Sequence, residues 1–395
     1  MAKSMAKNKP TSVSKKEKDK TVRTFAAAAF LNDMGSDMIF PIWPIFLTSI
    51  LGANMAVLGL IDGLGDAFVS LSQAGAGYAS DRLKKRKVFI WLGYFFGGIS
   101  RAGYAASTVW PQIIPFRILD RAGKIRDAPR DAIIADISAH GERGKNFGFL
   151  KAMDKAGAIV GIIICILLFN ILGYQFLFFA AAIPSLIGAL LVIKLIKEKK
   201  DGKIKLYKGI KLSNLTKDFR LLLILSALFA LGSFSYSFIL IFAKQAGFAD
   251  MFIPVLYLVF TVVAALLSIP FGRLADKIGR KPVMIIAFAL WALVCLIFIL
   301  TQNYLFILLS FVLYGLHKAA LDPVQKTFVS DLAPKKFRAS ALGGFQMVVG
   351  LCALPASLVA GILWDLYGAI APFTLSLILT IAATVILFFI KESSN

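Results

Sequence analysis

The chain has 395 residues, of which 58% are hydrophobic, and its formal net charge is +22 at pH 7. A soluble protein of this length lacks the polar surface to cover so much apolar area, whereas a membrane protein needs no such cover. Apolar runs of about 20 residues match the length of a transmembrane helix. Backbone in lipid must satisfy its own hydrogen bonds, so we predict an all-α membrane protein.

The predicted elements begin with a disordered basic tail over 1–23, which lacks the apolar segment of a secretory signal. Twelve transmembrane helices are then expected, at 24–48, 56–80, 87–107, 112–136, 145–168, 174–194, 220–243, 251–275, 282–301, 304–331, 338–363 and 370–390. A basic linker at 197–219 divides them into six-helix bundles over 24–196 and 220–391, and 392–395 form a C-terminal tail.

Basic residues concentrate in alternate connections. They cluster in the tail, at 82–87, in the linker, at 273–281 and at 335–338, while the connections 49–55, 107–111, 169–173, 245–250, 302–303 and 364–369 contain no Lys or Arg. The positive-inside rule then predicts cytoplasmic termini and a cytoplasmic linker in an inner-membrane protein. Since topology explains the net charge, we expect the bilayer as a partner and no nucleic acid.

The two bundles resemble each other in sequence. A gap-free shift of 195 residues brings pairs of identical residues into register between positions 52 and 373. They include Gly52 with Gly247, Gly77 with Gly272, Asp81 with Asp276, Asp136 with Asp331, Arg143 with Arg338, Gly148 with Gly343, Gly173 with Gly368 and Phe178 with Phe373. Parallel repeats of this kind place a cavity between the halves near the midplane, so we expect one here.

One charged motif occurs in both halves, as GYASDRLKKRK (77–87) and GRLADKIGRKP (272–282). Its Gly permits close helix approach, and its Asp and basic residues at a helix end can form ion pairs with a neighbouring helix. Such a cluster can hold a gate shut and break when it opens. The expected inner-gate residues are Gly77, Asp81, Arg82, Arg86, Asp136, Gly272, Asp276, Arg280, Asp331 and Arg338.

The spacing G-x-x-x-D-R-x-x-x-R and its second copy resemble motif A of the major facilitator superfamily. The resemblance implies a monomeric secondary transporter in which the two bundles rock about a central cavity, without a cofactor and with the proton as coupling ion. It also implies two inner ion-pair clusters, Asp81/Arg86/Asp136 and Asp276/Arg280/Asp331. Locally, strings such as GKIRDAPRDAIIAD resemble an uncharacterised prokaryotic subgroup.

The fourth span is unusually charged. One sector of this helix carries six charged residues: Arg117, Asp120, Arg121, Lys124, Asp127 and Asp131. Because charge at membrane depth is costly, this sector must face a cavity or a partner helix. Arg117 resembles the arginine of the family's motif B, although Asp120 and Arg121 depart from that motif. Candidate substrate-binding or proton-coupling residues on this and other spans are Asn32, Asp33, Asp37, Asp62, Asp66, Arg101, Arg117, Asp120, Arg121, Lys124 and Asp154.

Two interpretations of these charges stay open: structural ion pairs within the N-terminal half, or groups that bind substrate and carry protons. The leading functional prediction is proton-coupled export of a small organic compound. The family's antiporter signature is only partly present in the fifth span, which has its glycines at Gly157 and Gly161 but lacks its Pro-Gly-Gly part. The alternatives are import of an organic anion or iron chelate, and a non-transporting sensor or lipid-handling protein. We expect neither a metal site, which nearby arginines disfavour, nor an enzyme, because phosphate-loop, nucleophile-elbow and zinc signatures are absent.

Overall fold

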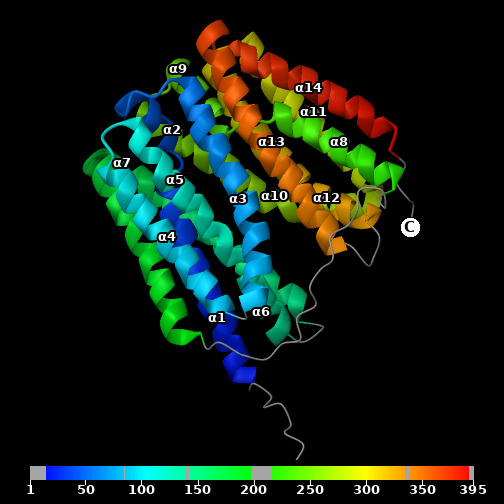
Figure 1. Cartoon of the computed structure of the whole chain (residues 1–395). Coiled ribbons are helices and arrows are strands. Elements are labelled where there is room, and N and C mark those ends of the chain that lie inside the picture. The colour runs from blue at the N-terminus through cyan, green and yellow to red at the C-terminus, as the bar shows by residue number, and fades with distance from the viewer. Residues whose placement is uncertain (1–14, 84, 139–141, 197–215, 334–337, 391–395) are drawn as a thin grey trace, which may run out of the picture.

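The computed structural model describes residues 15–83, 85–138, 142–196, 216–333 and 338–390. Within these ranges every regular element is a helix (Figure 1). The N-terminal half contains α1 (Lys15–Asp37), α2 (Trp43–Ile45), η1 (Phe46–Ile50), α3 (Met55–Leu83), α4 (Arg86–Ala106), η2 (Trp110–Gln112), α5 (Ile113–Ala122), η3 (Gly123–Arg126), α6 (Asp127–Ile137) and α7 (Arg143–Leu195). The C-terminal half contains α8 (Lys217–Gly232), α9 (Tyr236–Gln245), η5 (Asp250–Phe252), α10 (Ile253–Ile278), α11 (Arg280–Leu300), α12 (Tyr304–Leu332), α13 (Arg338–Tyr367) and α14 (Ile370–Phe388).

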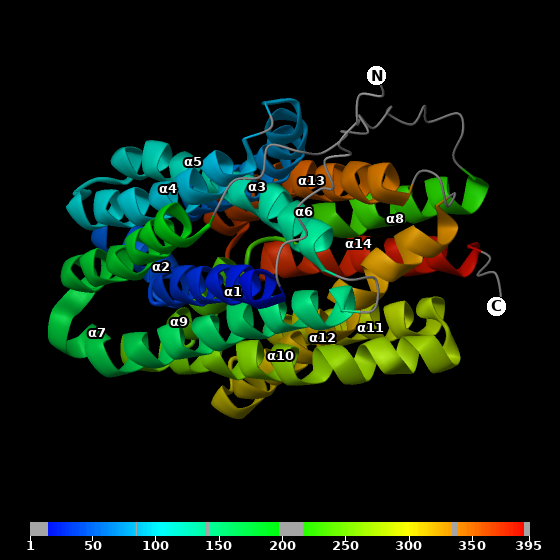
Figure 2. The same ribbon diagram turned by 90° about the horizontal axis from the view of Figure 1, so that it is seen from below.

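Eight segments of the described chain are long and apolar enough to cross a membrane. One of them, α7, has 53 residues and doubles back at Gly173, whose φ of 67° and ψ of −176° interrupt the helix (Figure 2). It therefore contains both the fifth and the sixth predicted spans. The multi-pass helical character is confirmed, whereas twelve spans and cytoplasmic termini stay predictions.

The predicted repeat is visible in the backbone. Gly52 and Gly247 have φ values of 70° and 104°, and Gly173 and Gly368 have φ values of 67° and 86°. Residues with a Cβ rarely adopt this left-handed conformation, so glycine is needed at each bend. Because each pair obeys the 195-residue shift, the two halves turn at equivalent points. The prediction of a disordered tail over 1–23 is wrong for residues 15–23, which form the first turns of α1. The other domain boundaries stay predictions: the tail before 15, residues 391–395 and most of the linker lie outside the described residues.

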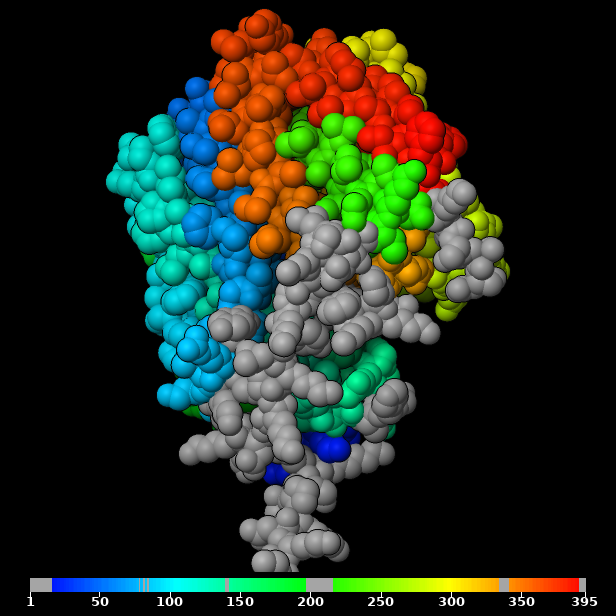
Figure 3. Space-filling view, turned by 45° about the vertical axis from the view of Figure 1, so that its right-hand side comes forward, coloured from blue at the N-terminus to red at the C-terminus, as the bar shows by residue number. Residues whose placement is uncertain are grey.

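Each half is a helical bundle with its own packing. In the first half α7 packs against α1 and α4, and in the second half α12 packs against α10 and α11, while α14 packs against α8 and α11. Across the halves, α3 packs along α13 and α7 packs against α10. Figure 3 shows α3 in blue lying directly beside α13 in orange. We call the end near Arg86 and Arg280 the basic end of the bundle, and the end near Gly52 and Gly247 the opposite end.

The buried apolar core is shared by the two halves at the opposite end only. The main cluster joins residues such as Phe46 and Phe178 of the first half to Phe242 and Phe298 of the second. At the basic end the first half keeps a separate cluster around Phe25, which contains residues of that half alone. The halves are therefore held together at the opposite end.

Candidate functional site

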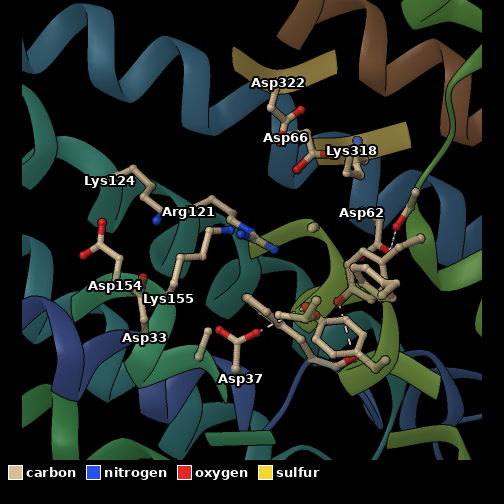
Figure 4. A pocket seen from close by; sticks show the side chains of 18 of the residues that line it. Asp33, Asp37, Asp62, Asp66, Arg121, Lys124, Asp154, Lys155, Lys318 and Asp322 are labelled. Carbon is tan, nitrogen blue, oxygen red and sulfur yellow. Dashed lines mark hydrogen bonds between the residues drawn. The ribbon is translucent and has the colours of Figure 1, made fainter. Parts of the chain in front are cut away.

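A cavity of about 530 Å³ lies between the two halves. The first half contributes most of its charged lining, and the second contributes mainly serines and aromatic side chains. Figure 4 shows the labelled aspartates, arginine and lysines around the same space. Of the candidate residues, the cavity is lined by Asp33, Asp37, Asp62, Asp66, Arg117, Arg121, Lys124 and Asp154.

The opposite end of the cavity is closed by direct contacts between the two halves. The N–H groups of Met55 and Ala56, at the start of α3, donate to the Asp365 carboxylate on α13 over 3.0 and 2.8 Å. These donors belong to a helix N-terminus, where an anionic partner is favourable. Further down the same interface, a Cβ at Gly59 would overlap the carbonyl of Ser357. The helices meet too closely there for any larger residue.

The basic end of the cavity is open. Lys155 and Asp322 line the cavity from opposite halves, and both are exposed. Among the described residues, no atom lies within 4 Å of a Cβ built at Gly272 on α10 or at Gly344 on α13. Gly59 is tightly packed against the other half near the opposite end, whereas Gly272 and Gly344 at the basic end have free space, so the cavity is closed at one end and open at the other.

The predicted inner-gate clusters assemble within each half. Arg86 on α4 pairs with Asp136 on α6 over 2.6 Å, and Arg280 on α11 pairs with Asp276 over 2.6 Å and with Asp331 over 3.3 Å. Arg82 is exposed at the end of α3. A Cβ at Gly77 would meet only Ala128, at an ordinary contact distance of 3.6 Å. The side chains of Asp81 and Arg338 lie outside the described residues, and whether these clusters act as a gate stays a prediction.

Three helices are interrupted where they pass the cavity. The chain leaves α1 at Asp37 and resumes helical structure at Trp43; η3 separates α5 from α6; and residues 233–235 separate α8 from α9. Irregular backbone at membrane depth is tolerated where it lines a cavity or lies buried in protein. Such breaks mark binding sites in many transporters, since they expose backbone and side-chain polar groups near the midplane.

Asp62 is the most completely bonded carboxylate of the site. Its Oδ1 accepts from Arg117 Nη2 over 2.7 Å and from Trp43 Nε1 over 2.9 Å. Its Oδ2 accepts from the hydroxyl groups of Ser235, over 2.7 Å, and Ser237. With 2% of its surface exposed, Asp62 is held as an acceptor by donors of both halves and acts as a polar clamp beneath the closed end.

The other cavity aspartates form fewer hydrogen bonds and ion pairs than Asp62. Asp37 is buried and accepts one hydrogen bond from the Tyr257 hydroxyl of the second half, over 3.2 Å. Asp33 accepts from Asn32 Nδ2 over 3.0 Å. Asp66 is exposed to the cavity, and the described residues provide it with neither an ion pair nor a hydrogen bond. Asp154 pairs with Lys151 over 3.2 Å.

Arg101, Asn32 and Asp120 lie beside the cavity instead of in it. They line an adjoining pocket of about 90 Å³ that shares Asp33 and Arg121 with the main cavity. Arg101 is 2% exposed and donates to the Asn32 and Ala181 carbonyl groups, to the Asn32 side chain and to two serine hydroxyl groups. Its hydrogen bonds join α1, α4 and α7, which assigns it a structural role in this conformation.

Several lining residues were outside the predicted site. Arg126 and Arg130 line the cavity, as do Ser235 and the aromatic groups of the second half. The polar sequence SFSYS (233–237) inside an apolar span was the available signal for the α8–α9 break. The aromatic residues gave no such signal, because phenylalanine and tyrosine are common throughout apolar helices.

The chain forms two helical bundles that are related by an internal repeat and enclose a charged central cavity. This architecture defines the class of polytopic membrane transporters. Within that class, the Major Facilitator Superfamily profile matches residues 25–258 and 221–395, and the chain belongs to this family. The predicted superfamily is thereby confirmed, and the chain falls in a transport class of proteins and not a catalytic one.

Known proteins resemble this chain over most of its length. An uncharacterised MFS-type transporter of Methanocaldococcus jannaschii is 40% identical over 363 residues, covering 89% of this chain and 90% of the relative. Multidrug resistance protein 2 of Bacillus subtilis is 30% identical over 318 residues, covering 77% and 79%. A solved bacterial homolog of the human lysosomal transporter Spinster, in an inward-facing and occupied conformation, has a TM-score of 0.78 at 14% identity, covering 95% and 97%, which shows a shared fold.

Proposed function

We propose that the protein is a proton-coupled exporter that moves a small organic compound across the inner membrane by alternating access. The cavity between the halves, closed at one end and open at the other, carries this proposal. A binding site that faces one side at a time is the basis of alternating access. The multidrug resistance protein that resembles this chain supports export as the direction.

The orientation follows from the distribution of charge. The open end of the cavity coincides with the end where basic connections cluster, which the positive-inside rule places in the cytoplasm. We therefore take the structure as the inward-open state, which receives substrate from the cytoplasm. The solved homolog in an inward-facing conformation supports this assignment.

Asp37 is our candidate for proton coupling. It is a buried carboxylate that contacts the second half through a single hydrogen bond from Tyr257, 3.2 Å long, and pairs with no Lys or Arg among the described residues. Hydrogen bonds to an ionised carboxylate are about twice as strong as those to a neutral group. Protonation of Asp37 therefore weakens one link between the halves, and Asp33 and Asp66 are available to pass the proton to the open end.

The test is a flux experiment with the purified protein in liposomes that contain a pH-sensitive dye. Gradients of tetraphenylphosphonium, 2-naphthoate and 2-naphthamide are imposed in turn. We expect at least one compound to drive proton movement that requires the protein and that Asp37→Asn abolishes. Glu142→Gln, which neutralises an exposed carboxylate just before α7, is the control and should preserve it.

Each other outcome is informative. Flux of a compound without proton movement would refute the coupling but keep the transporter. Binding of a compound with no flux under any gradient would favour the alternative of a sensor.

A further inference from the structure

Several basic residues of the cavity lie close together, and some of their nitrogen atoms have no hydrogen-bond acceptor among the described residues. Arg117 and Arg121 lie side by side: a Cβ built at Gly65 would be 3.1 Å from Arg117 Nε and 3.3 Å from Arg121 Nε. Three nitrogens of this pair, Arg117 Nε and Nη1 and Arg121 Nε, lack a hydrogen-bond acceptor among the described residues. Asp62 matches Arg117, but the carboxylate nearest to Arg121 is Asp120, at 3.7 Å.

Two lysines extend this patch. Lys124 on η3 and Lys155 on α7 line the same cavity, and neither forms an ion pair in the part of the chain that the structure describes. In Figure 4 the Arg121 guanidinium and the Lys124 and Lys155 ammonium groups point toward one region of the cavity. We call Arg121, Lys124 and Lys155 the basic patch.

The carboxylates around the basic patch form few interactions with it. Asp120 lies 3.7 Å from Arg121, which is too long for a hydrogen bond. Asp33, Asp66 and Asp127 line the same cavity, and among the described residues none of them forms an ion pair or a hydrogen bond with Arg121, Lys124 or Lys155. Asp154 is paired with Lys151 instead, over 3.2 Å. Charges at membrane depth are costly without such partners, and an anion that enters the cavity would accept the hydrogen bonds that these cations lack.

The second half faces the basic patch with a continuous aromatic wall. The rings of Tyr236 and Tyr257 have centroids 5.3 Å apart, Tyr257 and Phe260 4.7 Å, and Phe260 and Tyr314 5.1 Å, each in an edge-to-face arrangement. Two of the hydroxyl groups are fixed, that of Tyr236 on the Phe40 carbonyl and that of Tyr257 on Asp37. All four rings line the cavity and offer a rigid surface for a planar group.

We propose that the substrate class is organic anions with a planar ring, the anionic group held by the basic patch and the ring by the aromatic wall. This inference rests on the proposed function for the location of the site, and it adds the chemistry of what the site accepts. Two features determine which substrates bind: the positive charge of the first half and the aromatic rings of the second. Lipophilic cations are repelled by the basic patch, and aliphatic anions lack a ring that can pack against the aromatic wall.

Binding to the purified full-length protein, without any ion gradient, tests the proposal independently of transport. The probes are 2-naphthoate, its neutral analogue 2-naphthamide, the ring-saturated anion cyclohexanecarboxylate and the cation tetraphenylphosphonium. We expect 2-naphthoate to bind more tightly than each of the others by about tenfold or more, since a charge-assisted hydrogen bond is worth that factor. Titration calorimetry and thermal stabilisation give the dissociation constants.

Variants then separate the two parts of the site. Arg121→Gln, Lys124→Gln and Lys155→Gln should each weaken 2-naphthoate by roughly tenfold and leave 2-naphthamide unchanged. Lys244→Gln, which removes a cation at the opposite end, is the matched control. Phe260→Leu should reduce the preference for 2-naphthoate over cyclohexanecarboxylate. Since Lys155 is exposed, its variant should fold even where Arg121→Gln does not.

The proposal fails if 2-naphthamide or tetraphenylphosphonium binds as tightly as 2-naphthoate, or if Lys155→Gln weakens all probes equally. Selective anion binding combined with an absence of proton-coupled flux would instead overturn only the proposed function.

Discussion

At the scale of single residues, two buried charges in the first half are stabilised in different ways. The Asp62–Arg117 pair is an ion pair with side chains only 2% and 3% exposed, whereas the hydrogen bonds that the structure describes for Arg101 all go to neutral oxygen atoms. Both were predicted as substrate-binding or coupling residues. A list of charged residues does not reveal which of them already have partners inside the protein, so the sequence could not separate these roles.

The buried pair makes Asp62 critical for stability. Asp62→Asn leaves the Arg117 cation uncompensated in the interior, and we expect a loss of about 3–5 kcal/mol, the usual cost of removing one partner from a buried pair. Asp136→Asn breaks an exposed pair, whose carboxylate side chain is 66% exposed, and should cost about 0–1 kcal/mol. Thermal unfolding in detergent measures both. If Arg117→Met fails to restore part of the stability lost in Asp62→Asn, the clamp is not an ion pair in solution.

Arg101 gives a contrasting prediction. Its hydrogen bonds reach α1 and α7 in different directions, a geometry that a guanidinium group provides and an ammonium group does not. Arg101→Lys should therefore lower the stability by about 1–3 kcal/mol through unsatisfied acceptors. Ligand affinity of the folded fraction should stay within about twofold of the original. A selective loss of affinity with unchanged melting temperature would show instead that Arg101 contacts the substrate.

At the scale of helices, sequence reasoning located the helical segments well and their interruptions poorly. Hydrophobic length and basic connections fix where a helix starts and ends in a membrane, so the predicted ranges overlap the observed helices throughout. The break at 233–235 and the 3₁₀ segment η3 depend on tertiary contacts, above all on Asp62 drawing two serines toward it. Local pattern carries little information about such contacts, and for that reason the second half of the site was missed.

The glycines of the repeated motif provide a prediction at this scale. Gly272 has free space around it in the inward-open state, so a larger residue there should not disturb this state. Transport requires the basic end to close, and the new side chain would prevent the helices from approaching one another there. Gly272→Leu should therefore bind ligand normally and lose transport, whereas Gly59→Leu, at the tightly packed opposite end, should destabilise the fold. Transport by Gly272→Leu at the original rate would contradict a closing role for this glycine.

At the scale of the molecule, one end of the cavity is accessible and the other is sealed. In a chain whose three native cysteines are replaced by serine, Asp322→Cys should react with a membrane-impermeant thiol reagent added on the cytoplasmic side. Ser237→Cys, buried beneath the closed end, should resist the same reagent added outside. Inside-out and right-side-out vesicles provide the two orientations. Labelling of Asp322→Cys from outside alone would reverse the predicted topology.

The unequal walls of the cavity have a consequence for how this protein can change. The two halves, related by the 195-residue repeat, differ in what they present to the cavity: the first carries nearly all the charged lining and the second presents mostly rings. Replacing Phe260, whose ring bears no hydroxyl group, alters the shape of the site and leaves the hydrogen bonds of the buried carboxylates intact, whereas Tyr257 is bonded to Asp37. New specificities are therefore accessible at such rings of the second half, while the first half preserves the ionic network.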